Sequence, residues 1–262
     1  HPHPFTIRAY ACDAYGHLNN VNYLRFMHEA AFGASRAAGY DFARYRTEKP
    51  VGLIRDNAIT FSQPLHYRNE IEVRTWIDDF RRVRSRRMYE FRRGGDEQPA
   101  AVASTDWVLV DADSHQPQRI PDAMVEVFSP GGPPEAGDKR SPFPQPPEPP
   151  EGAYIHEHRV GFTELDSMQH LNNANYLAIA VAAGSAATRH FGWPVSRLLA
   201  MGYAWLARAA RIEYRGQPRL DDRLHVTTFL ADPRRVGARR YYLFHDAASG
   251  ELVAQAYHDW VF

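Results

Sequence analysis

The sequence contains one cysteine, Cys12, among its 262 residues, and no excess of either charge. A single cysteine excludes an internal disulfide and is typical of the reducing cytoplasm. The 31 basic and 31 acidic residues cancel, which argues against a nucleic-acid-binding protein, because such proteins carry a basic excess. No run of 18 apolar residues is present, so no membrane span is predicted. We therefore expect a cytoplasmic protein.

A polar stretch of the form D-x3-H-L-N-N-x-N-Y-L occurs twice, over Asp13–Leu24 and Asp166–Leu177. The same offset of 153 residues aligns matching residues far downstream, including Arg81-Arg82-Val83 with Arg234-Arg235-Val236, and Asp106-Trp107 with Asp259-Trp260. A unit of roughly a hundred residues is too long for a solenoid repeat but suits a small domain. The chain is therefore interpreted as a tandem duplication.

Nine prolines lie between the repeats, within residues 129–152. Proline at this density lacks backbone donors and favours an extended, stiff spacer. We therefore predict an N-terminal domain over 1–128, a proline-rich linker over 129–152 and a C-terminal domain over 153–262.

Apolar spacing predicts one order of elements in both units. In the first unit, a strand over Phe5–Cys12 precedes the polar stretch, and a helix over Asn22–Ala38 follows it and ends at Gly39. Asn19 and Asn20 are suited to cap that helix. Strands are expected near 51–61, 70–78, 82–92 and 101–110, with a short helix over 121–128. The second unit should have a helix over 175–190 and strands near 206–214, 223–230, 238–245 and 252–262. This is an α+β pattern, with a helix on an antiparallel sheet.

These residues resemble the hotdog-fold thioesterases. The first stretch, D-x3-H-x-N-N-x-x-Y with Gly16 before the histidine, resembles acyl-CoA thioesterases of the 4-hydroxybenzoyl-CoA type. The second, L-D-x-M-x-H-L-N-N-x-x-Y, resembles acyl-carrier-protein (acyl-ACP) thioesterases, which are tandem double hotdogs. The resemblance covers both units and implies two long central helices wrapped by one continuous antiparallel β-sheet. It also implies acyl sites at the seam between the halves.

Each unit offers three candidate catalytic residues, namely Asp13, His17 and Asn20 in the first and Asp166, His170 and Asn173 in the second. The carboxylate can act as general base or attack directly. A helix start presents unpaired N–H groups to a developing oxyanion. The resemblance implies that the asparagine N–H polarises the thioester carbonyl, and the histidine could orient water or the carboxylate. Alternatively these residues are only helix caps and a core histidine; their occurrence twice favours catalysis.

The neighbouring Asn19, Asn172, Tyr23 and Tyr176 are candidates for substrate binding. The copies also differ, because Glu29 is replaced by Ala182 at the matching position, and Gly16 by Gln169. Glu29 is a further catalytic candidate if it faces the opposite half's site; otherwise it makes a structural polar contact. Our hypothesis is that both aspartates contribute and that the Asp13 site dominates.

Arginines recur on the predicted strands. Arg82, Arg84 and Arg86 would line one side of a strand, since alternate residues share a face, and Arg235 is the counterpart of Arg82 in the second unit. Such a patch suits the phosphates of coenzyme A or the acidic surface of acyl carrier protein. The equal alternative is a solvated sheet face that resists edge aggregation.

Three other groups of residues are given no catalytic role. Cys12 has Leu165 as its counterpart, so we expect a small buried strand residue rather than a nucleophile. His156-x-His158 has no further ligands at metal spacing, so no metal is expected. An acyl channel could be lined by several large apolar residues whose default role is core packing, namely Met27, Phe32, Met201, Tyr203 and Trp205.

The sequence thus predicts a thioesterase that hydrolyses acyl-CoA or acyl-ACP thioesters to free acid and thiol without a dissociable cofactor. One alternative is a hotdog hydratase or dehydratase, which the x3 spacing disfavours. Another is a non-catalytic acyl-thioester sensor, which a DNA-binding segment would normally accompany. We expect acyl-CoA or acyl carrier protein as partner, no nucleic acid and no membrane span; self-association is left open.

Overall fold

The computed structural model describes residues 1–41, 43–44, 50–111, 114, 116–132 and 141–262. These residues form two compact units, His1–Pro142 and Phe143–Phe262. The linker predicted over 129–152 spans that division, and its residues 133–140 lie outside the described residues, so its bounds stay a prediction. No helix in the described part is both long and apolar enough to cross a membrane.

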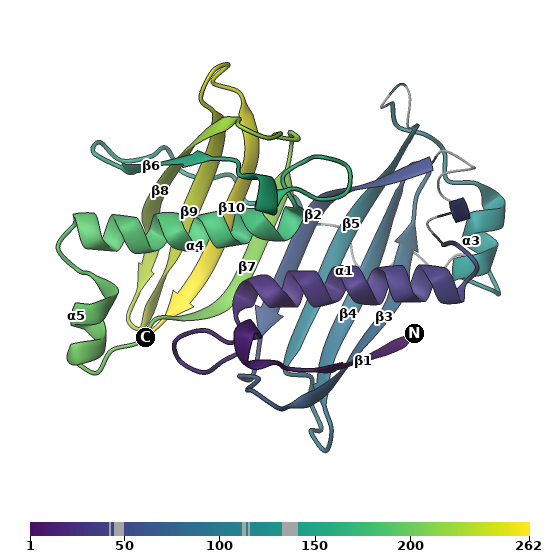
Figure 1. Cartoon of the computed structure of the whole chain (residues 1–262), viewed down its shortest axis with the longest axis horizontal. Coiled ribbons are helices and arrows are strands. Elements are labelled where there is room, and N and C mark those ends of the chain that lie inside the picture. Colours follow the sequence, from purple (N-terminus) through teal and green to yellow (C-terminus); the bar gives the residue numbers. More distant parts are fainter. Residues whose placement is uncertain (42, 45–49, 112–113, 115, 133–140) are drawn as a thin grey trace. The chain divides into compact units, whose positions relative to one another are not determined.

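Unit 1 is an antiparallel sheet with strand order β1–β3–β4–β5–β2, and helix α1 lies across one face of it (Figure 1). A 3-10 turn over Ala9–Ala11 precedes the helix. The elements are β1 Pro2–Thr6, α1 Asn20–Ala37, β2 Pro50–Phe61, β3 Glu70–Phe80, β4 Arg84–Arg93, β5 Ala101–Asp111 and α3 Asp122–Phe128.

Unit 2 repeats this arrangement, with strand order β6–β8–β9–β10–β7 and helix α4 against one face (Figure 1). Its elements are β6 Tyr154–Arg159, α4 Asn173–His190, α5 Val195–Ala200, β7 Leu206–Tyr214, β8 Arg223–Arg234, β9 Gly237–Asp246 and β10 Leu252–Val261. The expected helix on an antiparallel sheet is confirmed within each unit. That the two helices are central to one continuous sheet concerns how the units join and stays a prediction.

The helix bounds have local causes. The side chain of Asn19 accepts a hydrogen bond from Val21 N at 3.0 Å, and Asn172 does the same for Ala174 N at 2.9 Å. Both asparagines are therefore N-caps, which satisfy one otherwise unpaired N–H at each helix start. Gly39 follows α1 with φ +79°, a left-handed conformation that glycine adopts without strain, so it ends the helix as predicted.

The strand predicted over Phe5–Cys12 is wrong beyond Thr6. The chain turns there, and the carbonyl of Ala11 accepts from Asn19 N at 2.9 Å and from Asn22 Nδ2 at 2.9 Å. Those bonds hold the 3-10 turn against the helix start. Cys12 accordingly lies outside the strand and is half-buried, which corrects the expectation of a buried strand residue.

The helix of unit 2 presents small residues to its sheet. Ala180, Ala183 and Ala187 are buried, and Gly184 lies beneath Tyr242 of β9. A Cβ added at Gly184 would stand 2.9 Å from the Tyr242 hydroxyl oxygen. The helix can therefore approach the sheet this closely only because residue 184 has no side chain.

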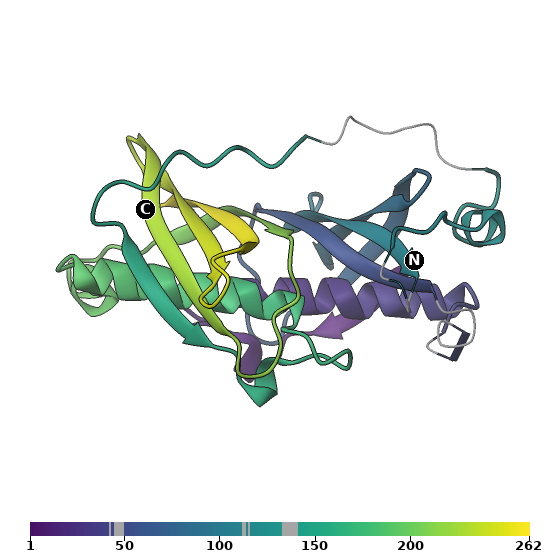
Figure 2. The same cartoon turned by 90° about the horizontal axis from the view of Figure 1, so that it is seen from above.

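Residues 143–152, the part of the predicted linker within unit 2, lie on the other face of this sheet, away from α4 (Figure 2). Phe143 packs against Tyr257 of β10, with ring centroids 5.6 Å apart, and the Arg211 guanidinium lies 5.6 Å from the Phe143 ring. The helix and the extended segment thus cover opposite faces of the unit 2 sheet.

Gly237, buried at the start of β9, should not tolerate a side chain. A Cβ there would overlap the carbonyl oxygen of Trp260 and lie 3.3 Å from its carbonyl carbon. Backbone atoms of a paired strand cannot rotate away, so we expect Gly237→Ala to lower the free energy of unfolding in urea by about 3 kcal/mol. Gly94→Ala, with no atom within 4 Å, is the control and should change it by less than about 0.5 kcal/mol. If the two variants lowered the free energy of unfolding equally, the clash at Gly237 would not be the cause.

Candidate active site

The repeated stretch folds in unit 1 into a loop organised by Asp13. Its Oδ1 accepts from the backbone N–H groups of Tyr15 at 2.9 Å and His17 at 3.0 Å. The Asp13 N–H donates to the His17 carbonyl at 2.7 Å. Among the described residues, Oδ2 of Asp13 has no hydrogen bond. One carboxylate oxygen therefore fixes the loop and leaves the other available.

Unit 2 builds the same loop around Asp166, whose Oδ1 accepts from Met168 N at 2.8 Å and His170 N at 3.3 Å. The loop needs a left-handed residue, which is Gly16 at φ +78° in unit 1 and Gln169 at φ +63° in unit 2. A non-glycine residue in that region costs roughly 1–2 kcal/mol. The second loop is therefore the more strained copy.

The start of α1 leaves one donor unpaired. Val21 N is bonded to the Asn19 side chain, and Asn22 N donates to the Asn19 carbonyl at 2.8 Å. The N–H of Asn20, the residue before these two, has no partner in the described part of the chain. The matching bonds in α4 leave the Asn173 N–H in the same state. Each helix thus presents a single free N–H at the positive end of its dipole.

Each aspartate lies near the tyrosine that follows on the helix. Tyr23 is buried against Phe61 and Phe91, with ring centroids 5.0 Å away in both cases. Burial, and secondarily the charge of Asp13, raises the pKa of the Tyr23 hydroxyl well above its usual value. Burial and Asp166 act alike on Tyr176. Both tyrosines are core residues beside the loops, and their role in substrate binding stays a prediction.

The histidines of the two loops have different neighbours. The His17 ring lies edge-on to His66, with centroids 5.1 Å apart, and His66 Nδ1 is 3.3 Å from the Gly16 carbonyl oxygen. The sequence did not point to His66, because its counterpart in unit 2 is Arg219 and the repeat is broken there. The Asp13 loop thus has a second imidazole at its edge, and the His170 loop has none at the matching position.

Glu29 is exposed on α1, nine residues after Asn20, which is about 13 Å along a helix axis. Within unit 1, Glu29 is therefore too far along the helix to take part in a site at the Asp13 loop. Asn19 and Asn172 use their side-chain oxygens as helix caps, so their role in substrate binding also stays a prediction.

The predicted row of arginines is not one row. Arg84 and Arg86 lie on β4, whereas Arg82 precedes the strand in the turn from β3, and Arg235 lies in the turn between β8 and β9. Arg86 forms two hydrogen bonds to Asp106, at 2.8 and 2.9 Å, which raise the pKa of its guanidinium. The exposed Arg82, Arg84 and Arg235 are therefore better placed to meet a ligand than Arg86.

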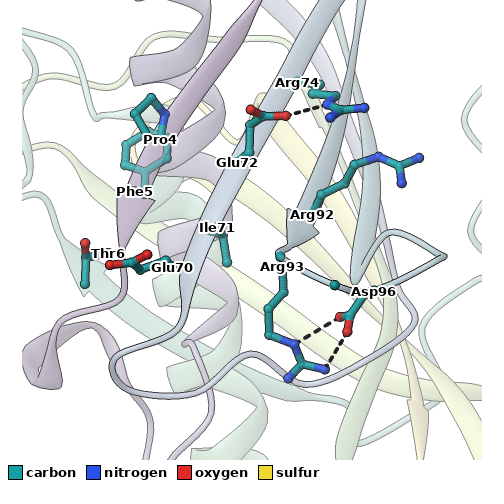
Figure 3. Close-up of a pocket in the computed structure, with 12 residues that line it drawn as sticks. Pro4, Phe5, Thr6, Glu70, Ile71, Glu72, Arg74, Arg92, Arg93 and Asp96 are labelled. Carbon is teal, nitrogen blue, oxygen red and sulfur yellow. Dashed lines mark hydrogen bonds and ion pairs between the residues drawn. The ribbon is translucent and has the colours of Figure 1, made fainter.

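A groove of about 720 Å³ runs over β1, β3 and β4 of unit 1 (Figure 3). Its arginines face carboxylates, with Arg74 against Glu72 and Arg93 against Asp96. No lining residue belongs to the Asp13 loop. The groove therefore offers little uncompensated positive charge and lies apart from the candidate site.

The apolar residues considered for an acyl channel divide by burial. Met27 is buried beneath the unit 1 sheet, and Trp205 is half-buried. Phe32, Met201 and Tyr203 are exposed, so core packing does not explain them.

Solved structures of similar fold are known, although no curated protein matches the chain. An oleoyl thioesterase described from Lactobacillus plantarum has a TM-score of 0.85 at 15% identity, covering 99% of this chain and 95% of that one. The 12:0-ACP thioesterase of Umbellularia californica has a TM-score of 0.80 at 18% identity, with 99% and 96% covered. An acyl-ACP thioesterase of Bacteroides thetaiotaomicron has a TM-score of 0.72 at 14% identity, with 99% and 97% covered.

At these identities the structural likeness establishes the fold. The family assignment rests on the sequence, since residues 7–128 and 160–262 both match the thioesterase-like superfamily. The two matched segments are the two copies of the repeat, and together they span most of the chain. The chain therefore belongs to the thioesterase-like superfamily.

Proposed function

We propose that this thioester hydrolase cleaves acyl-CoA or acyl-ACP thioesters to a free carboxylic acid and a thiol, at sites formed by the Asp13 and Asp166 loops. The observation that carries the proposal is the pairing of a free carboxylate oxygen with a free N–H at the helix start. Asp13 with Asn20 supplies this pair in unit 1, and Asp166 with Asn173 supplies it in unit 2.

In the proposed reaction, the thioester carbonyl oxygen accepts a hydrogen bond from the Asn20 or Asn173 N–H. The aspartate takes a proton from water, and the resulting hydroxide adds to the carbonyl carbon. The helix N-terminus stabilises the tetrahedral oxyanion, a contribution of roughly 3 kcal/mol for one such donor. Collapse of the intermediate breaks the C–S bond, and the protonated aspartate returns its proton to the departing sulfur, so that the thiol and the acid are released and the carboxylate is restored. Direct attack by the carboxylate, through an acyl-anhydride intermediate, is the other route.

We assign the larger share of turnover to the Asp13 site. Its loop has the relaxed Gly16 and the His17–His66 pair, whereas the Asp166 loop holds Gln169 in a strained conformation. The reaction requires no dissociable cofactor, because water, a carboxylate and a backbone donor suffice. The names of the two acyl-ACP thioesterases of like fold support a carrier-protein thioester as one substrate. The single cysteine supports a cytoplasmic location.

The test is thiol release, followed with a thiol-reactive dye, from short, medium, long and aromatic acyl-CoAs and from acyl-ACP. Turnover on any of them supports the proposal and defines the acyl group and carrier. Tight binding of acyl-CoA without thiol release would instead favour the sensor. Hydration of an enoyl thioester without hydrolysis would favour a hydratase.

Salt should reduce turnover if the exposed arginines attract an acidic substrate. Neither Arg82 nor Arg84 forms an ion pair among the described residues. At 0.1 M salt, attraction between exposed charges more than about 10 Å apart is largely screened. We expect kcat/KM to fall steeply with added salt and the slope to flatten in Arg84→Ala. Arg86→Ala, which removes a partner of Asp106, should lower stability and leave the slope unchanged. A flat salt profile of the unmodified protein would assign the arginines to solubility alone.

A further inference from the structure

The turn that follows the first long strand is bonded to the aspartate loop in each unit. In unit 1, Leu18 N donates to the Leu65 carbonyl at 2.6 Å, immediately after the loop. The matching bond in unit 2 runs from Leu171 N to the Pro218 carbonyl at 2.8 Å. This turn therefore lies at the rim of each candidate site. We call it the rim turn, residues 62–69 in unit 1 and 215–222 in unit 2.

The two rim turns have the same backbone. Arg68 N donates to the Ile7 carbonyl at 2.9 Å, and Asp221 N donates to the Val160 carbonyl at 3.0 Å. The offset of 153 residues relates both members of each pair. Arg68 and Asp221 also share a left-handed conformation, each with φ +68°. The units can therefore be compared here residue by residue, and they differ in their side chains.

The charge of the rim differs between the units. Unit 1 has Arg68 where unit 2 has Asp221, and it has Arg8 where unit 2 has Gly161. Unit 2 gains one arginine, Arg219, in place of a histidine, but two of the next three residues are aspartates. Of the two rims, the one in unit 1 is therefore the more basic.

Arg8 and Arg68 are neighbours in space, because the peptide group that joins Ile7 to Arg8 accepts the N–H of Arg68. Both arginines are exposed, and neither side chain has an ion pair or a hydrogen bond among the described residues. Glu70, the nearest acidic residue along the chain, lines the groove of Figure 3 and pairs with neither of them. Two uncompensated guanidinium groups therefore lie together beside the rim turn of unit 1.

The backbone conformation of Arg68 is unfavourable for an arginine. A left-handed residue other than glycine costs roughly 1–2 kcal/mol, and aspartate and asparagine adopt this conformation more readily than arginine does. The exposed Tyr67 ring lies 5.2 Å from the Arg68 guanidinium carbon, but no hydrogen bond of the side chain offsets the cost among the described residues. Strained residues of this kind are concentrated at functional sites, so the strain points to a ligand of the Arg68 side chain.

The position of the two arginines indicates which part of a substrate they would meet. Arg68 is three residues from Leu65, so the Cα atoms of these residues are at most about 11 Å apart, and Leu65 is bonded to the end of the Asp13 loop. In a pantetheine thioester, the sulfur and the phosphate stand at opposite ends of a long flexible arm. A thioester held at the Asn20 N–H would therefore place its phosphate at the rim. Guanidinium groups suit such a phosphate, since they can donate two parallel hydrogen bonds to its oxygens.

We propose that Arg8 and Arg68 bind the phosphate at the end of the pantetheine arm of substrates that react at the Asp13 site. The inference rests on the proposed function, because it takes the arm to enter at this loop. The same phosphate occurs in coenzyme A and in the phosphopantetheine group of an acyl carrier protein, so both carriers can use the contact. The Asp166 site, with Asp221 in place of Arg68, would bind this phosphate less tightly.

The test compares two thioesters of one acyl group, acyl-phosphopantetheine and acyl-pantetheine, which differ only in the phosphate. Turnover is measured by thiol release in the full chain carrying Asp166→Asn, so that the Asp13 site is observed alone. We expect kcat/KM to be at least about tenfold higher for the phosphorylated substrate, mainly through KM. Adding Arg8→Gln and Arg68→Asn should reduce this ratio below about threefold. Asparagine suits the left-handed conformation at position 68, so the variant should fold.

Arg36→Gln is the matched control. Arg36 is an exposed arginine in the last turn of α1, and 16 residues separate it from Asn20, which is about 24 Å along the helix axis. The variant removes the same charge from unit 1 and should leave the ratio of the two kcat/KM values unchanged. An equal fall of the ratio in Arg36→Gln would mean that overall charge, rather than the two rim arginines, selects the phosphate.

A second readout does not depend on hydrolysis. In isothermal titration calorimetry of the unmodified protein, free phosphopantetheine should bind at least about tenfold more tightly than pantetheine. The Arg8→Gln, Arg68→Asn variant should lose most of that preference. If no thioester were hydrolysed but this preference remained, the phosphate site would stand and only the proposed function would fail.

Several outcomes would overturn the proposal. Equal affinity for the two thiols, no measurable binding of either, or a preference that the double variant retains would each do so. With acyl-CoA and acyl-ACP as substrates, the double variant should lose kcat/KM to a similar extent on both. A loss confined to acyl-CoA would assign the arginines to the nucleotide, and a loss confined to acyl-ACP would assign them to the acidic protein surface. Either result would contradict binding of the shared phosphate.

Discussion

The double variant Asp13→Asn, Asp166→Asn is expected to lose at least about a thousandfold in kcat/KM for thiol release. Asparagine keeps the side-chain oxygen that accepts from Tyr15 N and His17 N in unit 1, so the loops should persist. It removes the negative oxygen that acts as base or nucleophile, and such groups contribute roughly 10²–10⁴-fold. Single variants should divide the loss unequally, with Asp13→Asn the more severe.

Asp246→Asn is the matched control for this experiment. Asp246 organises a surface turn by accepting from Ala248 N at 3.1 Å and Ser249 N at 2.7 Å, which is the same local chemistry away from either helix start. It should retain full turnover. A double variant as active as that control would remove both aspartates from the mechanism, and an Asp166→Asn variant weaker than Asp13→Asn would reverse the ranking.

The second large effect concerns stability in acid. Burial, together with the charge of Arg240, lowers the pKa of His258 to about 3 in the folded protein, although Asp259 opposes the shift. The unfolded chain protonates this imidazole below about pH 6.5. Acid therefore stabilises the unfolded state alone. The contribution of His258 is complete above pH 6.5 and is lost as the pH falls toward 3. Between pH 7.5 and 4.5 the loss is roughly 3 kcal/mol.

The measurement is urea unfolding of the unmodified protein and of His258→Gln at several pH values from 7.5 to 4.5. Carboxylates also titrate in that range, so the difference between the two pH slopes, rather than either slope, reports on His258. We expect the free energy of unfolding of the variant to fall by roughly 3 kcal/mol less than that of the unmodified protein across the interval. Replacement of the exposed His190 by glutamine should leave the slope as it is. If the free energy of unfolding varied with pH in parallel for the unmodified protein and His258→Gln, His258 would be protonated as readily in the folded protein as in the unfolded chain.

Local sequence patterns predicted most elements because those patterns were duplicated intact. Strand β7 lies where alternation placed it, over Leu206–Tyr214, and both long helices begin within two residues of their predicted starts. The aspartate loops were also recognisable, since their polar residues recur at fixed spacing. Periodicity and capping are short-range properties, so a single chain suffices to detect them.

What escaped prediction depends on partners distant in sequence. The turn at Ala9–Ala11 is held by Asn22, and alternation alone made this segment look like a strand. Arg86 was expected in a row of arginines that either binds an acidic ligand or faces solvent, yet it pairs with Asp106, which is 20 residues away. Both of those residues recur in the second unit, where Arg239 binds Asp259 at 2.7 Å, and that joint recurrence was the available signal. His66 breaks the repeat, so nothing in the pattern distinguished it.

The glycine at position 184 also bears on the history of the two halves. Its counterpart is Ala31, and the counterparts of Tyr242 and His258 are Tyr89 and Thr105. In the second half, the His258 imidazole Nδ1 lies 3.2 Å from the Tyr242 hydroxyl oxygen, which is the atom that crowds Gly184. In the second half, histidine thus stands where the first half has the smaller Thr105, and Gly184 lacks the methyl group of Ala31. Such compensated divergence means that the paralogous interiors are no longer interchangeable one residue at a time, although each accommodates its own combination.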